Sequence, residues 1–165
     1  MKIEHDGEVS LQLVGNVVVC PSAVDPSREL TFQIEHLVDR AKEIFGQRQA
    51  RNEPLVLNIV GHPASGKSIL ARVLAQSLPQ CHYRSGTMEG LHRQAWVFAV
   101  SKDTIIIDEY PAFCARQAWI TEYLQDYVKE GGRVVLVTQS LEQVPDNNLR
   151  GGIISMGQTE SLVPV

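Results

Sequence analysis

The segment GHPASGKS at residues 61–68 constrains the fold of this chain more than any other feature. It follows an apolar run at residues 55–60 and precedes a run with helical periodicity at 69–76. Gly61 and Gly66 allow the backbone between them to curl, so that successive N–H groups point inward. A helix that begins directly after such a loop adds unpaired N–H groups and the positive end of its dipole. The order of strand, curled loop and helix therefore predicts an α/β fold with an anion site at the loop.

The same segment matches the P-loop (Walker A) pattern, G-x-x-x-x-G-K-S, between a strand and a helix. We expect Lys67 to reach the β- and γ-phosphates of ATP, as a catalytic residue, and Ser68 to supply a hydroxyl to Mg²⁺. His62 fits a contact with the nucleotide or a variable loop position. The alternative is a glycine-rich turn that binds nothing. The expected phosphate-binding set is Gly61, His62, Pro63, Ala64, Ser65, Gly66, Lys67, Ser68 and Ile69.

A second apolar run, residues 104–107, ends in two acids, Asp108 and Glu109. The carboxyl ends of parallel strands face the ligand crevice of an open α/β sheet. This pattern is typical of a Walker B strand, in which Asp108 would hold the magnesium shell and Glu109 would align and polarise the attacking water. The alternative is an ordinary strand end that carries acids.

The rest of the chain alternates apolar strands with helical segments, which predicts a parallel sheet covered on both faces. The expected strands are 55–60, 81–84, 104–108, 133–138 and 152–156, and the expected helices are 67–77, 88–100 and 115–129. Trp119, Tyr123 and Tyr127 form a stripe on the last helix, which fits either the core or a docking edge for a partner.

The first 50 residues carry different signals. Residues 2–20 alternate around turn residues and predict a small hairpin or pair of strands. Asp25-Pro26 favours a helix start, apolar residues follow at helical spacing, and Gly46 is a reasonable helix end. We expect one domain, 1–165, in which 1–50 form the N-terminal hairpin and helix and 51–165 form the nucleotide-binding core.

The adjacent Asp108-Glu109 pair, downstream of a Walker A segment, resembles the P-loop ATPases with an additional strand and a catalytic glutamate (ASCE), which include AAA+ proteins, helicases and DNA pumps. The resemblance implies a three-layer domain with a mostly parallel sheet of order 5-1-4-3-2, counted from the P-loop strand. It also implies a polar residue that senses the γ-phosphate at the end of the neighbouring strand. Thr138 and Gln139 occupy that position, Gln139 as a catalytic residue; the alternative is a merely polar strand end.

Within this group the likeness covers residues 55–157. IIIDEYPAF and GGRVVLVTQSLEQVPDNNLR resemble the FtsK–HerA class of DNA-translocating ATPases, whereas GHPASGKSILARVLAQSL is equally similar to AAA+ and small helicase ATPases. AAA+ remodellers have a helical lid with a sensor arginine after the last strand, and this sequence shows neither. Many such ATPases place an arginine finger before the last strand. Arg150 lies there, as a finger acting on a neighbouring subunit or as a solvated loop residue, with Arg116 and Arg133 as lesser candidates.

The composition limits which binding partners and which cellular compartment we expect. A net charge of −4 argues against non-specific binding to nucleic acid or acidic membranes. Three widely spaced cysteines fit reduced thiols in a cytoplasmic protein and predict neither a disulfide framework nor a zinc site. We find no apolar run long enough for a membrane span in the sequence.

Together these features predict Mg²⁺-dependent ATP binding and hydrolysis by a compact motor or assembly ATPase. By its resemblance, it would act on DNA or on a protein complex, as a homo-oligomer or with a partner. One alternative is a nucleotide-gated binding module with little turnover. Another is a small-molecule kinase, against which stand the Asp-Glu pair and the lack of an arginine-rich lid segment.

Overall fold

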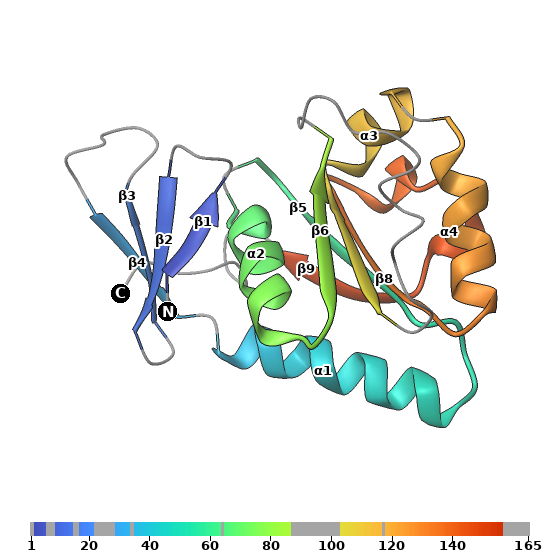
Figure 1. Cartoon of the computed structure of the whole chain (residues 1–165), viewed down its shortest axis with the longest axis horizontal. Helices are drawn as coiled ribbons and strands as arrows, with labels where there is room; N and C mark the ends of the chain where they lie inside the picture. The colour runs from blue at the N-terminus through green and yellow to red at the C-terminus, as the bar shows by residue number, and fades with distance from the viewer. Residues whose placement is uncertain are drawn as a thin grey trace.

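The computed structural model describes residues 2–5, 9–14, 17–21, 29–33, 35–63, 65–86, 103–116 and 118–156. Side chains are described within 36–63, 65–86, 103–115 and 118–156. The described strands form a four-stranded antiparallel sheet from the N-terminal residues and a five-stranded parallel sheet from the rest (Figure 1).

The parallel sheet has the order β6-β7-β8-β5-β9. Read from its other edge and counted from the P-loop strand, this is 5-1-4-3-2, so the predicted order is confirmed. The three central strands are short, rich in Val and Ile and largely buried, as expected for strands covered on both faces, whereas the edge strand β6 contains neither residue type. The strands are β5 (Val56–Gly61), β6 (Cys81–Ser85), β7 (Thr104–Asp108), β8 (Arg133–Thr138) and β9 (Gly152–Met156).

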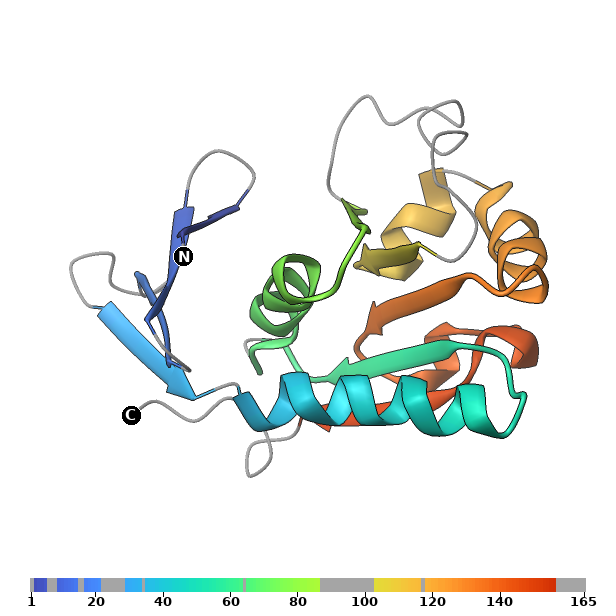
Figure 2. The same ribbon diagram turned by 60° about the horizontal axis from the view of Figure 1, so that its bottom comes forward.

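Helices cover both faces of this sheet (Figure 2). Along β5, Leu57 and Ile59 pack with α1 and α2, whereas Val56 packs with α3 and α4 on the opposite face. This alternation is the period-2 pattern of a strand between two helical layers, and it confirms the three-layer α/β fold. The helices are α1 (Glu35–Ala50), α2 (Lys67–Ser77), α3 (Tyr110–Arg116) and α4 (Ile120–Lys129). None of the described helices is long and apolar enough to cross a membrane.

The N-terminal residues form more strand than the sequence predicted. β1 (Lys2–His5), β2 (Val9–Val14), β3 (Val17–Pro21) and β4 (Glu29–Gln33) pair in that order as an antiparallel sheet. The expected helix start at Asp25-Pro26 is therefore wrong, since residues 29–33 pair with β3 instead. Leu30 and Phe32 are two residues apart, a spacing that fits a strand and not a helix.

The expected helix end at Gly46 is also wrong, because α1 continues to Ala50. A Cβ at position 46 would meet nothing within 4 Å, so this exposed glycine costs the helix about 1 kcal/mol in propensity and no packing. The chain turns away from the helix at Asn52, two residues after Ala50, where φ is 55°. The Asn52 N–H donates to the Gln49 carbonyl, and the Glu53 N–H donates to the Arg48 carbonyl. These are the two hydrogen bonds of a Schellman motif.

Residues 115–129 form parts of two helices where one was predicted, because α3 ends at Arg116 and α4 begins at Ile120. In the aromatic stripe, Tyr127 is buried and donates its hydroxyl to the Asp103 carbonyl at 2.6 Å. Tyr123 stacks on Tyr127, and Trp119 meets Tyr123 edge-on. These contacts agree with the interpretation in which the aromatic stripe packs in the core. The predicted helix at 88–100 lies outside the described residues.

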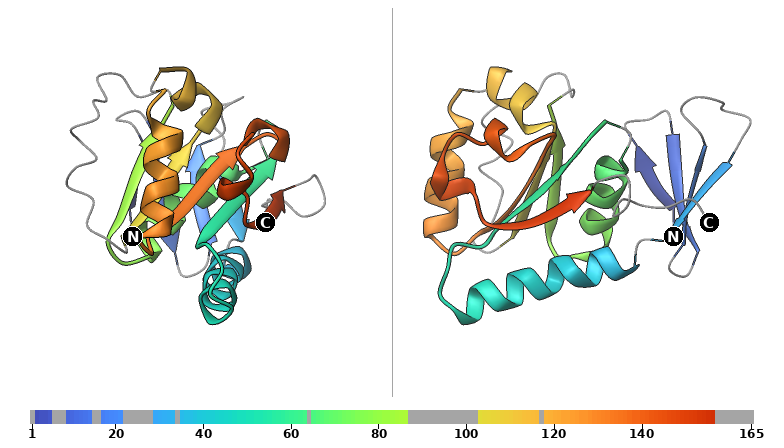
Figure 3. Two further views of the ribbon diagram at one scale, coloured as in Figure 1. Left: turned by 90° about the vertical axis from the view of Figure 1, so that its right-hand side faces the viewer. Right: turned by 180° about the vertical axis from the view of Figure 1, so that it is seen from behind.

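Two short 3₁₀ helices, η2 (Leu141–Gln143) and η3 (Asn147–Leu149), connect β8 to β9, where a turn or short helix was expected. Asn58, fully buried in β5, fastens this connection. Its side-chain amide donates to the Leu149 carbonyl at 3.1 Å and accepts from the Gly151 N–H at 2.7 Å. The rear view in Figure 3 shows the connection running back to β9 beside β5.

Candidate active site

The predicted Walker residues gather at the carboxyl edge of the parallel sheet. In the register, Val60 pairs with Thr138 at the end of β8, and Asp108 ends β7 one position beyond the pair of Ile107 with Leu136. A pocket of about 450 Å³ opens at this edge. It is lined by Pro63, Lys67, Ser68, Asp108, Glu109, Pro111, Ala112, Val137, Thr138, Gln139 and Gln143.

The loop before α2 is curled as the glycine pattern requires. The Ser65 N–H donates to the His62 carbonyl at 3.2 Å, and Gly66, with φ 92°, turns the chain into the helix. A Cβ on Gly61 would lie 2.4 Å from the Met156 carbonyl oxygen and 2.8 Å from the Ser65 hydroxyl. Only glycine therefore fits between β9 and the folded-back loop.

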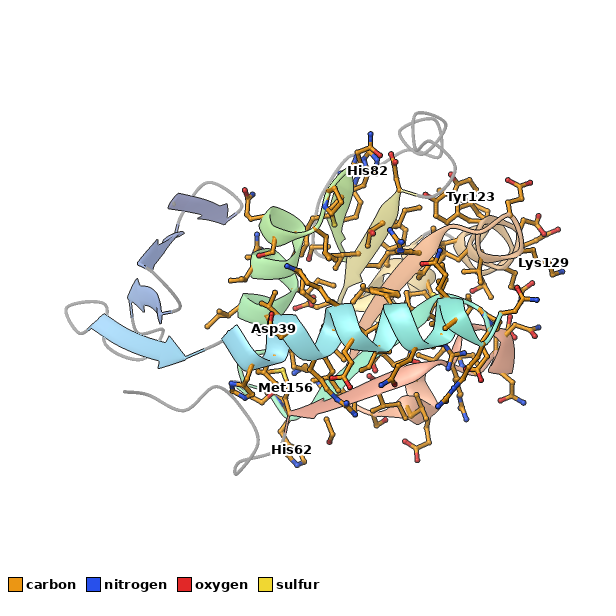
Figure 4. All side chains as sticks on the ribbon, turned by 90° about the horizontal axis from the view of Figure 1, so that it is seen from below. Asp39, His62, His82, Tyr123, Lys129 and Met156 are labelled. Atoms are coloured by element: carbon orange, nitrogen blue, oxygen red, sulfur yellow. The ribbon has the colours of Figure 1, made fainter. Side chains whose placement is uncertain are left out.

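Lys67 lies at the start of α2 and reaches back over this loop. Its Nζ donates to the His62 carbonyl at 2.8 Å. Burial lowers the pKa of Lys67, and the negative charges of Asp108 and Glu109 oppose that shift. Lys67 lines the same pocket as both acids. The His62 side chain is exposed at the edge of the molecule (Figure 4).

Asp108 is buried and held by two donors. The Tyr83 hydroxyl donates to its Oδ2 at 2.7 Å, and the Glu109 N–H donates to its Oδ1 at 2.9 Å. A carboxylate has about four acceptor positions, so about two remain for further partners. The buried oxygens are therefore oriented but not saturated.

Glu109 is exposed and has φ 51°, a left-handed conformation that is uncommon outside glycine and asparagine. The turn is fixed from both sides. The Glu109 carbonyl accepts from the Phe113 N–H at the start of α3, and the Asp108 carbonyl accepts from the Gly86 N–H at 2.9 Å. A Cβ on Gly86 would lie 2.5 Å from the Glu109 carbonyl oxygen. Backbone strain of this kind concentrates at functional positions.

Thr138 and Gln139 complete the pocket at the end of β8. The Thr138 Oγ1 is buried and has no hydrogen-bond partner within the described residues. The Gln139 N–H donates to the Gln143 Oε1 at 2.8 Å, which ties the end of β8 to η2. A buried hydroxyl without a partner beside a polar pocket is what a site for a hydrogen-bonding ligand requires.

The donor set at the pocket fits Mg²⁺ held jointly with phosphate oxygens. Ser68 and Asp108 offer hard oxygen ligands, and Mg²⁺ in nucleotide sites uses one or two protein oxygens plus phosphates and water. No group of three or more His, Cys, Asp or Glu side chains that could hold a metal occurs in the part of the chain that the structure describes. The residues present thus fit a shared magnesium site and not an all-protein cage.

Six of the described residues that were predicted for the site are not in the pocket lining, and one further predicted residue is not described. The six are Gly61, His62, Ser65, Gly66, Ile69 and Arg150. Arg150 lies two residues before β9, and Gly152 pairs with Leu57 near the start of β5, so the Arg150 backbone lies at the opposite edge of the sheet. The Ile69 side chain packs against the core cluster under α2, and the His62 side chain points away. Ala64 lies outside the described residues.

Sequence reasoning missed Tyr83, Gly86 and Gln143. Tyr83 and Gly86 contact Asp108 from more than 20 residues away in the chain, so no local pattern marks them. Gln143 contacts Gln139 only four residues away, but it belongs to no motif that singles it out. A glycine directly after a strand, as at Gly86, was the one available signal for a close backbone approach.

No protein-family model matches this chain, and no curated protein does. Solved structures do match. The Thermotoga maritima RuvB Holliday junction branch migration motor is 20% identical with a TM-score of 0.51, covering 76% of this chain and 45% of that one. A single-residue variant of that motor is 21% identical with a TM-score of 0.53, covering 76% and 46%.

This chain therefore spans less than half the length of the motors that it matches. The likeness to RuvB does not support the FtsK–HerA part of the sequence resemblance. At this level of identity the likeness concerns the fold, and the chain shares the P-loop ATPase fold of RuvB.

Proposed function

We propose that this chain binds Mg-ATP and hydrolyses it, as a subunit of an oligomeric motor or assembly ATPase. One observation carries the proposal. Lys67, Ser68, Asp108, Glu109 and Thr138 come from three separate segments and line a single pocket at the edge where a P-loop holds phosphate.

Each residue has a role that its position supports. The loop N–H groups and Lys67 would hold the phosphates, and Ser68 with Asp108 would hold Mg²⁺, which neutralises phosphate charge when bound. Glu109, exposed to the pocket, would orient the attacking water. Thr138 and Gln139 would donate to the γ-phosphate or that water.

Arg150 is proposed to act on the site of a neighbouring subunit. Gly152, two residues after Arg150, lies four strand positions, or about 13 Å, from the level of Gly61, and Arg150 is not among the residues that line its own pocket. Its Nε donates to the Val144 carbonyl at 2.6 Å, and Asn58 holds both of its chain neighbours. This rigid support suits a residue that must reach across an interface.

The partner is proposed to be DNA or a protein complex. The support is the likeness to RuvB, whose name describes a branch migration motor on Holliday junctions. With a net charge of −4, contact with DNA would need a local surface or several subunits together.

The test is nucleotide binding followed by turnover. Lys67→Ala should lose ATP binding, and Glu109→Gln should bind ATP but hydrolyse it at least about 10²-fold more slowly. Lys129→Ala, an exposed lysine on α4, is the matched control and should behave as wild type. Unchanged ATP affinity in Lys67→Ala would refute the site.

Measuring ATP turnover with and without DNA then distinguishes the candidate functions. A rise in ATP turnover with DNA supports the motor. ATP-dependent capture of a protein partner that survives in Glu109→Gln points to the nucleotide-gated module instead, and phosphate transfer to a metabolite points to a kinase.

A further inference from the structure

Tyr83 contributes a hydrogen bond to the site from a strand that does not line the pocket. It lies on β6, the edge strand of the parallel sheet, where it pairs with Ile106 of β7. Asp108 is two residues further along β7, on the same face as Ile106. A long side chain on one strand reaches this diagonal neighbour, and the Tyr83 hydroxyl lies 2.7 Å from Asp108 Oδ2.

The ring of Tyr83 is itself held from the P-loop helix. The guanidinium carbon of Arg72, a buried residue of α2, lies 4.6 Å from the ring centroid. A cation over an aromatic face is attractive, more so where water is excluded. Tyr83 therefore bridges the helix that carries Lys67 and Ser68 and the strand that carries Asp108.

The hydrogen bond fixes the orientation of the carboxylate. The Glu109 N–H occupies one acceptor position on Oδ1, and the Tyr83 hydroxyl occupies one on Oδ2. With a donor on each oxygen, rotation of the carboxylate would break at least one of these two hydrogen bonds. The remaining acceptor positions thus have a fixed direction.

We propose that Tyr83 is a positioning residue that orients Asp108 for the magnesium ion of bound ATP. The inference rests on the proposed function. Partners that orient a metal ligand from behind tune metal affinity, and their loss typically weakens it roughly 10- to 100-fold. Removal of the hydroxyl should therefore affect the metal-dependent part of ATP binding and spare the metal-free part.

The experiment measures the affinity for a fluorescent, non-hydrolysable ATP analogue across a Mg²⁺ titration and in EDTA. Tyr83→Phe removes the hydroxyl and keeps the ring under Arg72. We expect its Mg²⁺ midpoint to rise about tenfold while the affinity in EDTA stays at the wild-type value. Tyr127→Phe is the matched control, because it removes a buried hydroxyl that donates to the Asp103 carbonyl at the other edge of the sheet.

A graded variant makes the test independent of how well Tyr83→Phe folds. 4-Aminophenylalanine at position 83 keeps the ring and offers a weaker donor than the phenol. Its Mg²⁺ midpoint should lie above that of wild type and below that of Tyr83→Phe. A midpoint equal to wild type in either variant, or an equal loss of affinity with and without Mg²⁺, overturns the positioning role. Failure of the wild type to bind the analogue refutes the proposed function, and this inference with it.

Discussion

Gly66 and Gly131 adopt the same left-handed conformation in different surroundings. Both have φ 92°, Gly66 in the phosphate loop and Gly131 directly after α4. Alanine in this conformation costs about 1–2 kcal/mol, so each Gly→Ala change should lower the free energy of unfolding by about 1 kcal/mol. Only Gly66→Ala re-aims the loop N–H groups, so ATP affinity should fall roughly tenfold or more in that variant alone.

Denaturant unfolding and nucleotide titration of both variants check this prediction. Steric clashes do not affect the Gly131→Ala control, because a Cβ at position 131 would meet nothing within 4 Å. An equal loss of ATP affinity in Gly131→Ala would mean that the effect comes from stability and not from the loop.

Glu109 carries strain of the same kind on a residue with a chemical task. Asparagine tolerates a positive φ better than glutamate, so Glu109→Asn should raise the free energy of unfolding by up to about 1 kcal/mol while ATP turnover is lost. Gln80, with φ 49° in the turn before β6, is the control, and Gln80→Asn should stabilise equally without affecting turnover. Thermal unfolding and an ATPase assay test this prediction. If Glu109→Asn does not increase stability, the backbone of Glu109 is not strained.

At the level of elements, the connection between β8 and β9 depends on one buried side chain of β5. Asn58→Leu keeps the number and branching of the side-chain heavy atoms but leaves the Leu149 carbonyl and the Gly151 N–H without their partner. We expect the free energy of unfolding to fall by about 2 kcal/mol or more, since each orphaned buried group costs about 1–3 kcal/mol. Urea unfolding measures it, and the exposed Asn147→Ala in η3 should change stability by less than about 0.5 kcal/mol.

Cys81, at the start of β6, makes the free energy of unfolding fall at alkaline pH. Burial, with a smaller contribution from the charge of Asp103, raises the pKa of Cys81 from 9.0 to about 12. Between these values the unfolded state has lost the proton that the folded state keeps, so stability is complete below pH 9 and falls as pH rises toward 12. The slope from this group is about 1.4 kcal/mol per pH unit.

Cys81→Ala should therefore flatten the loss of stability between pH 9 and pH 11, measured by denaturant unfolding at each pH. Buried tyrosines such as Tyr127, whose pKa is also raised by burial, still contribute above pH 10 in that variant. A slope unchanged by Cys81→Ala would show that this thiol ionises alike in both states.

The elements that sequence reasoning predicted well are those with redundant signals. β7 and β8 match their predicted ranges because continuous Val and Ile runs end in polar residues, and α2 follows a P-loop. β4 was missed because its pairing with β3 depends on residues across a turn, which a local period does not show. Gly46 misled because an exposed glycine is tolerated inside a helix, whereas Asn52 supplied the actual end.

At the scale of the whole molecule, the site residues that sequence could predict are those that belong to short sequence motifs. Lys67, Ser68, Asp108 and Glu109 belong to such motifs, and the sheet order brings them to one edge. The supporting contacts from Tyr83 and Gln143 depend on tertiary packing, so sequence alone could not assign them. Arg150 differs from both groups, since its motif position places it at the edge remote from its own pocket.

That placement makes a prediction about assembly. If Arg150 acts across an interface, Lys67→Ala and Arg150→Ala should each be nearly inactive alone, yet a mixture should hydrolyse ATP. A pocket with an intact loop in an Arg150→Ala subunit would receive its arginine from a Lys67→Ala neighbour. In an equal mixture that exchanges subunits at random, one site in four has both parts, so turnover should recover to about a quarter of the wild-type rate.

The control is Arg150→Ala alone, which should keep wild-type ATP affinity because its own pocket is untouched. ATPase rates measured after mixing, with oligomer size followed by light scattering, distinguish the outcomes. Recovery requires that two subunits build each site. No recovery in mixed oligomers would mean that Arg150 supports only its own chain, where its bond to the Val144 carbonyl and the Asn58 clamp would then be structural.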